Sequence, residues 1–455
     1  MKPYIRILLC LLVGLSGCAT YRPLLLDDHP TTVTSISHLT MDAKRLPFPS
    51  LAGHKFDLSD GLDMTETAML AVANNPVLKL ARDDARIAQA QAFAAGLLPD
   101  PQFNLSRDFP RKPAPDTTSA FNAGLAYDLN ALVTHGAGAS AVRYDSRKTD
   151  LNLLWQEWQV VAQARLLFSR AVSQDRQLHW LTENRDLLAD RYAKSRAALE
   201  AGNLTLDIAN VSLAAWQDMS RLVNDLERLQ LQTRHDLNAL LGLVPGVTLK
   251  LVDDEPLAVP NEAAVMRALD DLPRRRPDLL ALKAGYAAQD ARYRQAILAQ
   301  FPPLNLAFTR TRDTAGLLTR GFALSMALPL LNGNRGNIRI EEATRQRLHD
   351  EYQTRLNTAH DEVELLVADN RLVAAQSRTT EAALPSLDCA ADHARLALAD
   401  GNLDGPGFAA LQSARIAKHV EAANLRQTLL ESRIALLTLL GGDFPVQPVL
   451  SEHSQ

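Results

Sequence analysis

The chain has 455 residues, of which 47% are apolar, 22% are charged and only 5% are aromatic. Because the apolar and charged fractions are close to those of globular proteins, wholesale disorder, collagen and low-complexity fibres are excluded. The formal net charge is −4, so no basic excess indicates a nucleic-acid partner. Few aromatic residues and much Ala, Leu, Gln and Arg predict long helices whose small side chains let the backbones pack closely.

The first 17 residues are predicted to be an export signal. Lys2 and Arg6 precede an apolar run at 7–15, which is too short for the roughly 20 residues of a membrane-spanning helix. The run closes with Leu-Ser-Gly before Cys18, which resembles a bacterial lipobox. We therefore expect residues 1–17 to be removed and Cys18 to carry a lipid. An ordinary secretory signal with an incidental cysteine is the alternative.

The residues after the signal indicate where the chain is exported and in what chemical state. Ala19 follows Cys18 where inner-membrane lipoproteins tend to have Asp, so the expected destination is the outer membrane, with the chain extending into the periplasm. Cys10 leaves with the signal, and Cys389 then has no disulfide partner within the chain. Because it lies in the Ala-rich stretch 384–398, we expect Cys389 to be a small buried hydrophobe.

Self-similarity is the most informative feature of the sequence. Pro76 corresponds to Pro277, and the pair Asn104-Leu105 corresponds to Asn305-Leu306, in each case 201 residues later. This pattern predicts two copies of one unit. The predicted divisions are the signal at 1–17, a lipid-anchored extended segment at 18–57, a first repeat at 58–244, a linker at 245–261, a second repeat at 262–443 and a C-terminal tail at 444–455.

Each copy shows the same predicted order of elements. A helical stretch opens it, at 62–98 and at 262–300, and each stretch contains a proline. Two short strands follow, then a very long helix, a Gly-Asn-Leu turn and a second long helix. In the first copy the long helix is expected at 139–200, which is about 93 Å at 1.5 Å per residue. No other stretch approaches 18 consecutive apolar residues, so any membrane-spanning part is expected to consist of strands.

The predicted strands alternate apolar with small or polar residues. This alternation, over about ten residues at 303–310 and 321–330, is typical of a transmembrane barrel strand, although an antiparallel sheet with one wet face looks the same locally. Four strands cannot close a barrel alone, so several chains would have to share one. The side chains predicted to face lipid are Leu304, Leu306, Phe308, Phe322, Leu324 and Met326.

The long helices carry a repeat of 3.5 residues. In the second copy the spacing 4-3-4-3-4-3 connects Tyr352, Leu356, Ala359, Val363, Leu366, Asn370 and Val373. Such spacing keeps one seam facing a partner helix, as in coiled coils. Helices of this length therefore need neighbours lying alongside them.

These features together resemble the TolC-like outer membrane efflux family. The resemblance rests on the lipobox, the duplication, and the segments 301–306 (Phe-Pro-Pro-Leu-Asn-Leu), 327–335 (Ala-Leu-Pro-Leu-Leu-Asn-Gly-Asn-Arg) and 274–279 (Arg-Arg-Arg-Pro-Asp-Leu). It implies an α+β membrane protein: a homotrimer whose twelve-stranded β-barrel, four strands per chain, continues into a periplasmic coiled-coil tunnel. The implied partners are a periplasmic adaptor (membrane fusion) protein, an inner-membrane resistance-nodulation-division pump and outer-membrane lipid. Segments 128–136 and 400–407 depart from the family pattern.

The predicted function is that of a passive duct. It would export drugs or metal cations delivered by the pump and adaptor; the substrate and the cognate pump are not encoded in an obvious motif. No phosphate-binding loop, His-Glu-x-x-His or Gly-x-Ser-x-Gly motif is present, so we expect no enzyme activity, cofactor or metal site. The alternatives are the outer-membrane component of a type I secretion system and a periplasmic coiled-coil scaffold lipoprotein without a pore. Strand alternation favours the duct over the scaffold.

Carboxylates gather next to the two Gly-Asn-Leu turns. Glu200, Asp207, Asp400 and Asp404 lie within six residues of a turn, and in a trimer each would form a ring that favours cations at a constriction. The alternative is that they are ordinary polar helix ends, with Asp207 capping a helix. The resemblance implies that the turns form the periplasmic entrance and contact the adaptor. The turn residues are Gly202, Asn203, Leu204, Gly401, Asn402 and Leu403.

Overall fold

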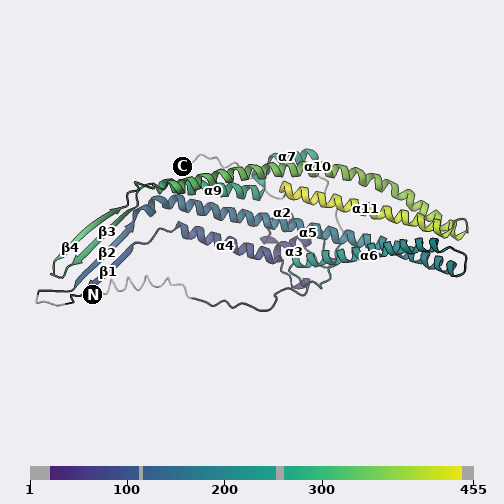
Figure 1. Cartoon of the computed structure of the whole chain (residues 1–455), viewed down its shortest axis with the longest axis horizontal. Coiled ribbons are helices and arrows are strands. Elements are labelled where there is room, and N and C mark those ends of the chain that lie inside the picture. The colour runs from purple at the N-terminus through teal and green to yellow at the C-terminus, as the bar shows by residue number, and fades with distance from the viewer. Residues whose placement is uncertain (1–20, 112–115, 253–260, 443–455) are drawn as a thin grey trace.

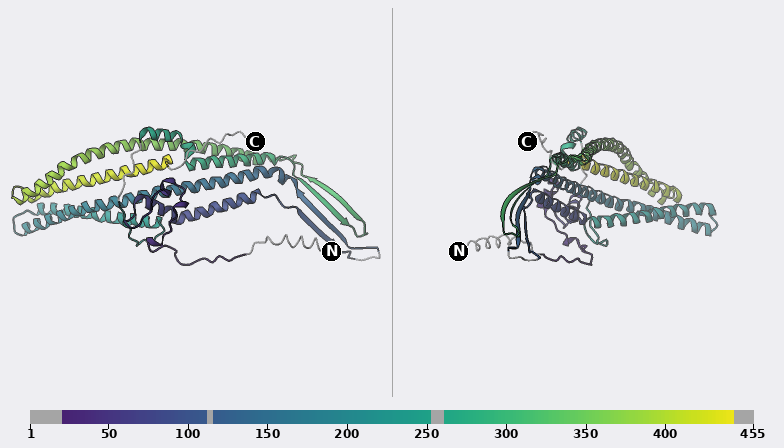
Figure 2. Two further views of the ribbon diagram at one scale, coloured as in Figure 1. Left: turned by 180° about the vertical axis from the view of Figure 1, so that it is seen from behind. Right: turned by 60° about the vertical axis from the view of Figure 1, so that its left-hand side comes forward.

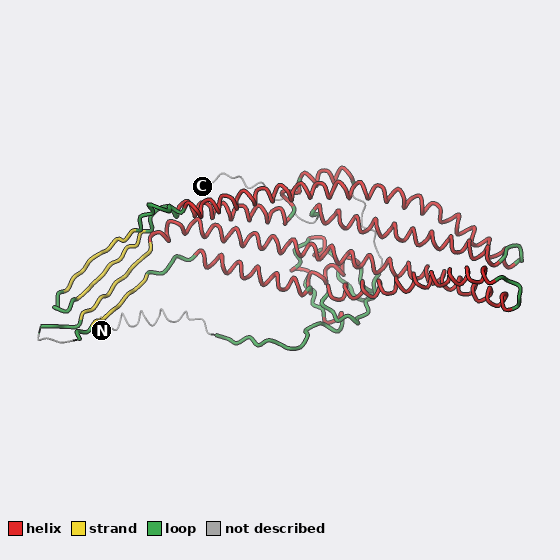
Figure 3. Tube along the Cα trace, in the orientation of Figure 1, coloured by secondary structure: helices red, strands yellow, loops and turns green. Residues whose placement is uncertain are grey.

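The computed structural model describes residues 21–111, 116–252 and 261–442. The chain is long and narrow, with a small sheet at one end and helices running away from it to the other (Figure 1). Seen from behind, the sheet and the helices again extend to opposite ends of the molecule, and the view turned by 60° shows the same elements foreshortened (Figure 2). The trace coloured by secondary structure is mostly helical, with its strands confined to that one end (Figure 3). A mainly helical chain with a small strand component was predicted, and this is confirmed.

The order of elements in the first half recurs in the second half. The first half contains η1 (Ile36–His38), η2 (Ala43–Arg45), α2 (Pro49–Ala52), α3 (Met64–Asn74), α4 (Pro76–Gly96), β1 (Gln102–Asp108), β2 (Ala120–Asp128), α5 (Leu129–Glu200) and α6 (Leu206–Leu240). The second half contains α7 (Glu262–Asp270), α8 (Leu272–Arg275), α9 (Pro277–Leu298), β3 (Leu304–Arg312), β4 (Leu318–Met326), α10 (Arg335–Ala399) and α11 (Gly405–Leu440).

Proline divides the opening helical stretch of each half, as predicted. Pro76 and Pro277 both occupy the first turn of a helix, α4 and α9 respectively, where the missing proline N–H has no intrahelical partner to lose. Asn75 caps α4 by accepting hydrogen bonds from the backbone N–H groups of Val77 and Leu78. The prolines therefore start new helices and do not bend continuous ones.

Helix α5 begins ten residues earlier than predicted. It follows β2 without a loop, because the Asp128 side chain accepts hydrogen bonds from Asn130 and Ala131 at the helix start. Its 72 residues correspond to about 108 Å. Gly136 and Gly138, whose helix propensity is low, both lie inside the helix. None of the described helices combines the length and apolar character that crossing a membrane requires.

The four strands form one antiparallel sheet in the order β1-β2-β3-β4. The register places Leu304 opposite Met326, and Phe308 opposite Phe322. The prediction of strands is confirmed, but the extent of the last one was wrong, since β4 ends at Met326 and excludes Leu328. Pro329 follows three residues later. A proline has no backbone N–H to donate to a neighbouring strand, and it restricts the backbone conformation of the residue before it.

The helices pack through the predicted seam. Ala359 and Val363 of α10 are buried, and Tyr352, Leu356 and Leu366 pack against the same cluster. In the first half the largest buried side chain is Trp158 of α5, whose indole N–H donates to the carbonyl oxygen of Thr438 in α11 at 3.0 Å. Both halves therefore share one packed helical body.

The described part of the N-terminal segment runs beside the helices on the side of α4 (Figure 1). Phe48 and Leu51 are fully buried, and the ring of Phe48 lies 5.1 Å from that of Trp158. Short parallel bridges join Val33 to Leu243 and Leu62 to Leu251. The segment is thus packed into the first core from residue 33 onward. Cys18, the signal and the tail at 444–455 lie outside the described residues.

Candidate functional site

The sheet has two chemically different faces. The register aligns Phe103, Leu125, Phe308 and Phe322 in one row across all four strands, and we call the face that carries this row the apolar face. The six side chains predicted to face lipid all lie on it, and apart from half-buried Leu304 they are exposed in the single chain. The opposite face, here called the polar face, carries small and polar residues: Gln102, Asn104, Ser106, Asn122, Gly124, Ala126, Asn305, Ala307, Thr309, Gly321, Ala323 and Ser325.

The two hairpin tips lie together at the end of the molecule farthest from the sheet (Figure 1). One tip joins α5 to α6 and the other joins α10 to α11. Gly202 and Gly401 have φ of 71° and 75°, in the left-handed region that favours glycine. The N–H of Asn203 donates to Ala198, and that of Asn402 to Ala397, both at 2.8 Å, which is the Schellman pattern. The Gly-Asn pairs therefore end their helices.

The structure places the remaining tip residues in similar positions on the two hairpins. Leu204 and Leu403 are half-buried, whereas Gly202, Asn203, Gly401 and Asn402 are exposed. The exposed set consists of small or amide side chains and backbone groups. These are surfaces that a partner helix can approach closely.

The four predicted entrance carboxylates are exposed at the tips, and three of them have local partners. Glu200 ends α5 and accepts a hydrogen bond from Arg196 at 2.9 Å. Asp404 caps α11 by accepting the N–H of Gly407 at 2.8 Å. The pKa of Asp207 lies below its ordinary value, first because the Thr205 side chain donates to it and then because of backbone N–H groups. Asp400 follows the last residue of α10.

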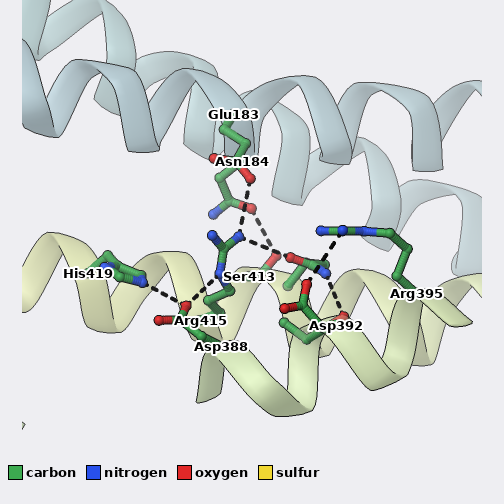
Figure 4. A network of polar contacts seen from close by, with 10 residues as sticks. Glu183, Asn184, Asp388, Asp392, Arg395, Ser413, Arg415 and His419 are labelled. Atoms are coloured by element: carbon green, nitrogen blue, oxygen red, sulfur yellow. Dashed lines mark hydrogen bonds and ion pairs between the residues drawn. The ribbon is translucent and has the colours of Figure 1, made fainter. Parts of the chain in front are cut away.

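Behind the tips, a polar network connects α5 with α10 and α11 (Figure 4). Arg415 of α11 lies between Asp388 of α10, at 2.8 Å, and Glu183 of α5, at 3.3 Å. Ser413 donates to Asn184 at 2.9 Å. His419 Nε2 lies 2.9 Å from Asp388 Oδ1. Among the described ion pairs between the two hairpins, the one in this network, Arg415 with Glu183, lies nearest to the tips.

Aromatic stacking supports the same contact. The ring of Trp180 in α5 stacks on that of His419, with centroids 4.2 Å apart and planes 12° apart. The guanidinium carbon of Arg415 lies 5.2 Å from the centre of the Trp180 ring, within reach of a cation–π interaction. The sequence indicated long helices here but not which side chains join them, because the pairs are more than 200 residues apart.

We expect Asp388→Asn to weaken this contact modestly and in a pH-dependent way. The hydrogen bond from His419 and then that from Arg415 lower the pKa of Asp388 below 3.8. A carboxyl group whose pKa is lower in the folded than in the unfolded state stabilises the fold at pH values above its unfolded-state pKa. This stability is lost as the pH falls through the folded-state pKa. Because the side chain is 41% exposed, solvent screens it, and the cost is about 0.5–1 kcal/mol at neutral pH. Chemical unfolding followed by circular dichroism measures it.

Asp392→Asn is the matched control for that substitution. Asp392 lies one turn farther along α10, and its ion pair among the described residues is with Arg395 on its own helix, at 3.4 Å. We expect the difference between Asp388→Asn and wild type to persist at about pH 5 and to disappear near about pH 2. A difference that is as large in strong acid as at neutral pH would contradict the assignment.

Comparisons with known proteins give a consistent fold. No protein-family model matches the sequence, and neither does any curated protein. Among solved structures, the outer-membrane channel OprN superposes with a TM-score of 0.70 at 16% identity, over 93% of this chain and all of that one. CusC, described in terms of transmembrane channel formation, gives 0.67 at 18% identity, over 86% and 95%. The Campylobacter jejuni outer membrane channel CmeC gives 0.67 at 16%, over 85% and 87%.

The chain has the TolC-like outer-membrane channel fold. The predicted resemblance is confirmed at the level of the fold. Sequence identities of 16% to 18% establish the fold and nothing beyond it. In this channel fold the sheet and the hairpin tips lie at opposite ends of the elongated molecule, as Figure 1 shows.

The prediction that Cys389 is buried was wrong. Cys389 is exposed on α10, although its Ala-rich surroundings had predicted burial. Ala391, two residues farther and therefore on nearly the opposite side of the helix, is buried, so that side of α10 is the one that packs. Local composition does not reveal the rotation of a helix about its axis, and alanines are common on exposed helix faces as well as buried ones.

A cluster of possible metal ligands was not noticed in the sequence. His54, Asp63 and Glu66 lie within 4.8 Å of one another. The carboxylate of Glu66 accepts the N–H groups of Asp57 and Asp63, while Asp63 accepts that of Glu66 and lies 3.0 Å from His54. This is the capping box of α3. The three-residue spacing of Asp63 and Glu66 is the sequence signal that predicts the capping box. The carboxylate oxygens of both residues already have partners.

A hollow of about 650 Å³ lies where the sheet meets the helices. Its most reactive groups are engaged: His135 Nε2 lies 3.2 Å from the carbonyl oxygen of Leu97, and Arg292 pairs with Asp145. Glu341 accepts from Gln289. In this part of the described chain the polar groups hold helices together and are not arranged around a nucleophile.

Proposed function

We propose that the chain is the outer-membrane channel of a tripartite efflux system. It would act as a passive duct for drugs or metal cations, which an inner-membrane resistance-nodulation-division pump and a periplasmic adaptor deliver. The observation that carries the proposal is the two-faced sheet at one end of a channel-like fold. The apolar face suits lipid, and the small and polar residues of the opposite face suit a water-filled lumen.

The sheet edges support a homotrimer. Strands β1 and β4 each have one neighbour within the described chain, which leaves a row of backbone N–H and C=O groups unpaired. In a bilayer each such group costs several kcal/mol. Because the four strands alternate in direction, β4 of one chain and β1 of the next would meet antiparallel. Three chains would then close a barrel of twelve strands.

The recurring element order supports an internal duplication, with repeats at 58–244 and 262–443 joined by the linker at 245–261. The lipobox supports removal of residues 1–17 and lipidation of Cys18, so that the segment 18–57 is anchored in the outer membrane. The tail at 444–455 would lie outside the second repeat. Neither enzyme activity nor a cofactor or metal site is part of this proposal.

Channel activity can be tested directly. The purified full-length protein, added to planar bilayers, should produce discrete conductance steps, and native mass spectrometry should give the mass of three chains. A coiled-coil scaffold without a pore would give trimers or other oligomers without conductance steps. Absence of steps from protein whose trimer is intact would therefore overturn the proposal.

The tips are proposed as the periplasmic entrance. The exposed tip residues at 202–204 and 401–403 would contact the adaptor, and the carboxylates of Glu200, Asp207, Asp400 and Asp404 would form rings at the constriction. Rings of carboxylates attract cations and repel anions. Nearness of both tips at one end of the molecule supports this placement (Figure 1).

We expect Asp400→Asn combined with Asp404→Asn to raise single-channel conductance or to weaken block by divalent cations several-fold. Asn removes the charge but keeps the cap that Asp404 gives α11, so the trimer should be unaffected. Asp207→Asn should shift both quantities less, in the same direction. Planar-bilayer recordings with and without a divalent cation measure them.

The matched control removes two carboxylates of α6 that lie away from the tip. Asp218 and Asp225 are exposed, and each pairs with an arginine three residues later. Asp218→Asn with Asp225→Asn should leave block unchanged. If the tip variant and this control behave alike, the aspartates of the tips are ordinary helix ends.

A further inference from the structure

Four arginines gather at the loop end of the sheet, which is the end where the β1–β2 and β3–β4 loops lie. The register places Arg310 directly opposite Arg320. In the next row, Phe121 lies between Arg107 and Arg312. By their alternation along the strands, all four belong to the apolar face. We call Arg107, Arg310, Arg312 and Arg320 the arginine cluster.

The members of the arginine cluster fall into two pairs by their contacts. Arg107 and Arg312 both donate to Ser119, at 3.2 Å to its hydroxyl, and Arg312 also donates to its carbonyl oxygen at 2.8 Å. Arg310 and Arg320 are exposed. Within the residues that the structure describes, the side chains of Arg310 and Arg320 make no hydrogen bond or ion pair.

Among the described residues, no carboxylate pairs with Arg310 or Arg320. Like charges directly opposite one another across two strands destabilise a sheet, and Arg310 faces Arg320 in this way. The carboxylates within the strands, Asp108 and Asp128, lie on the polar face. Asp313, next along the β3–β4 loop, accepts the N–H groups of Ala315 and Leu317 and so shapes the turn. An anion from outside the chain would remove the repulsion.

The cluster also has a defined depth. Arg310 and Arg320 lie two residues beyond the row of Phe308 and Phe322, which is about 7 Å along the strands. Toward the helices from that row the apolar face carries only apolar and aromatic side chains. The arginines therefore mark the level at which charged side chains begin on this face, among apolar ones such as Leu105 and Phe121, as is expected where the headgroup layer of a bilayer begins.

Guanidinium groups suit oxyanions. Their planar fork binds carboxylate or phosphate through two parallel hydrogen bonds, and phosphate is the oxyanion that a membrane lipid headgroup supplies. We propose, resting on the function proposed above, that the arginine cluster binds the phosphate groups of a phosphorylated glycolipid, lipid A, in the outer leaflet. Arg310 and Arg320 would contact the phosphates, and Arg107 and Arg312, held by Ser119, would flank them. A trimer would carry three such sites.

The test uses the full-length protein in detergent and measures lipid A binding by native mass spectrometry. Arg310→Gln with Arg320→Gln should weaken binding of lipid A carrying two phosphates by about 30-fold, at about fivefold per arginine near an anionic surface. Zwitterionic phosphatidylcholine should bind the two proteins equally. Inorganic phosphate at matched concentration should compete weakly, because it has no acyl chains to lie against the apolar face.

The matched control removes two other exposed arginines. Arg221→Gln with Arg228→Gln on α6 lowers the net charge by the same amount far from the sheet, and should leave lipid A binding at the wild-type level. Equal loss in both variants, or no loss in either, would overturn the proposal. Competition by inorganic phosphate as strong as that by lipid A would overturn it as well, leaving a general anion site.

Conductance separates this proposal from the proposed function. Because the arginine cluster lies on the face away from the lumen, Arg310→Gln with Arg320→Gln should retain the conductance and ion selectivity of wild type in planar bilayers. Altered selectivity would place the arginines in the lumen and overturn the lipid site alone. Failure of the wild-type protein to conduct would instead overturn the channel, whatever the lipid binding.

Discussion

Replacing Asp278 with Asn should lower the free energy of unfolding by about 3–5 kcal/mol. The guanidinium of Arg276 is wholly buried, with 0% of its side chain exposed, and its Nε and Nη2 donate to the two carboxylate oxygens of Asp278 at 2.9 and 2.6 Å. Its Nη1 has no hydrogen-bond partner among the described residues. Without the carboxylate a buried positive charge would be left with one amide oxygen. Guanidinium chloride unfolding followed by circular dichroism measures the loss.

The neighbouring contacts make Asp278 hard to replace. Arg355 of α10 also donates to it, at 3.1 Å, and the guanidinium carbon of Arg276 lies 5.0 Å from the centre of the Trp155 ring in α5. Asp278 thus connects the start of α9 to two long helices. Asp271→Asn is the control, because Asp271 is more exposed than Asp278 and its ion pair with Arg274 is long, at 3.9 Å. This substitution should cost at most about 1 kcal/mol. Equal losses in the two variants would contradict the assignment.

Periodic features were predictable from the sequence. Alternation with period two determines which residues share a face, and so Leu304, Leu306 and Phe308 were assigned together correctly. The 3.5-residue spacing likewise located the buried side of α10. The two Gly-Asn-Leu turns were predictable because a helix that ends in a Schellman motif needs a residue that tolerates positive φ. Each of these depends on neighbours within a few residues.

Features that depend on distant partners were not predictable. The segment Arg274–Leu279 was noticed as a motif, but the burial of Arg276 requires Trp155 and Arg355, which lie on other helices. The arginine cluster requires the register of three strand pairs, since alternation within one strand does not show that Arg310 faces Arg320. The start of α5 was missed for a different reason: the cap from Asp128 outweighs the low helix propensity of Gly136 and Gly138.

Leu324→Arg should cost about 2–4 kcal/mol of barrel stability, while Ala323→Arg should be tolerated. Leu324 lies opposite Leu306 on the apolar face, and Ala323 lies opposite Ala307 on the polar face. In the proposed barrel the first substitution places a charge in lipid near the bilayer midplane, where that cost applies. The second places the same charge in a water-filled lumen. The fraction of heat-stable trimer in the outer membrane, compared between the two variants, measures the difference.

Arg320 supplies an internal reference for this prediction. It lies on the same face and the same strand as Leu324, four residues closer to the loop end, and the chain carries it naturally. The cost of a lipid-facing arginine falls to about 0–1 kcal/mol near the membrane interfaces, so tolerance at 320 and intolerance at 324 are the pattern that a bilayer imposes. A sheet wetted on both faces would accept arginine equally at 323 and 324. That outcome would remove the reason for placing the apolar face in lipid, and with it the barrel.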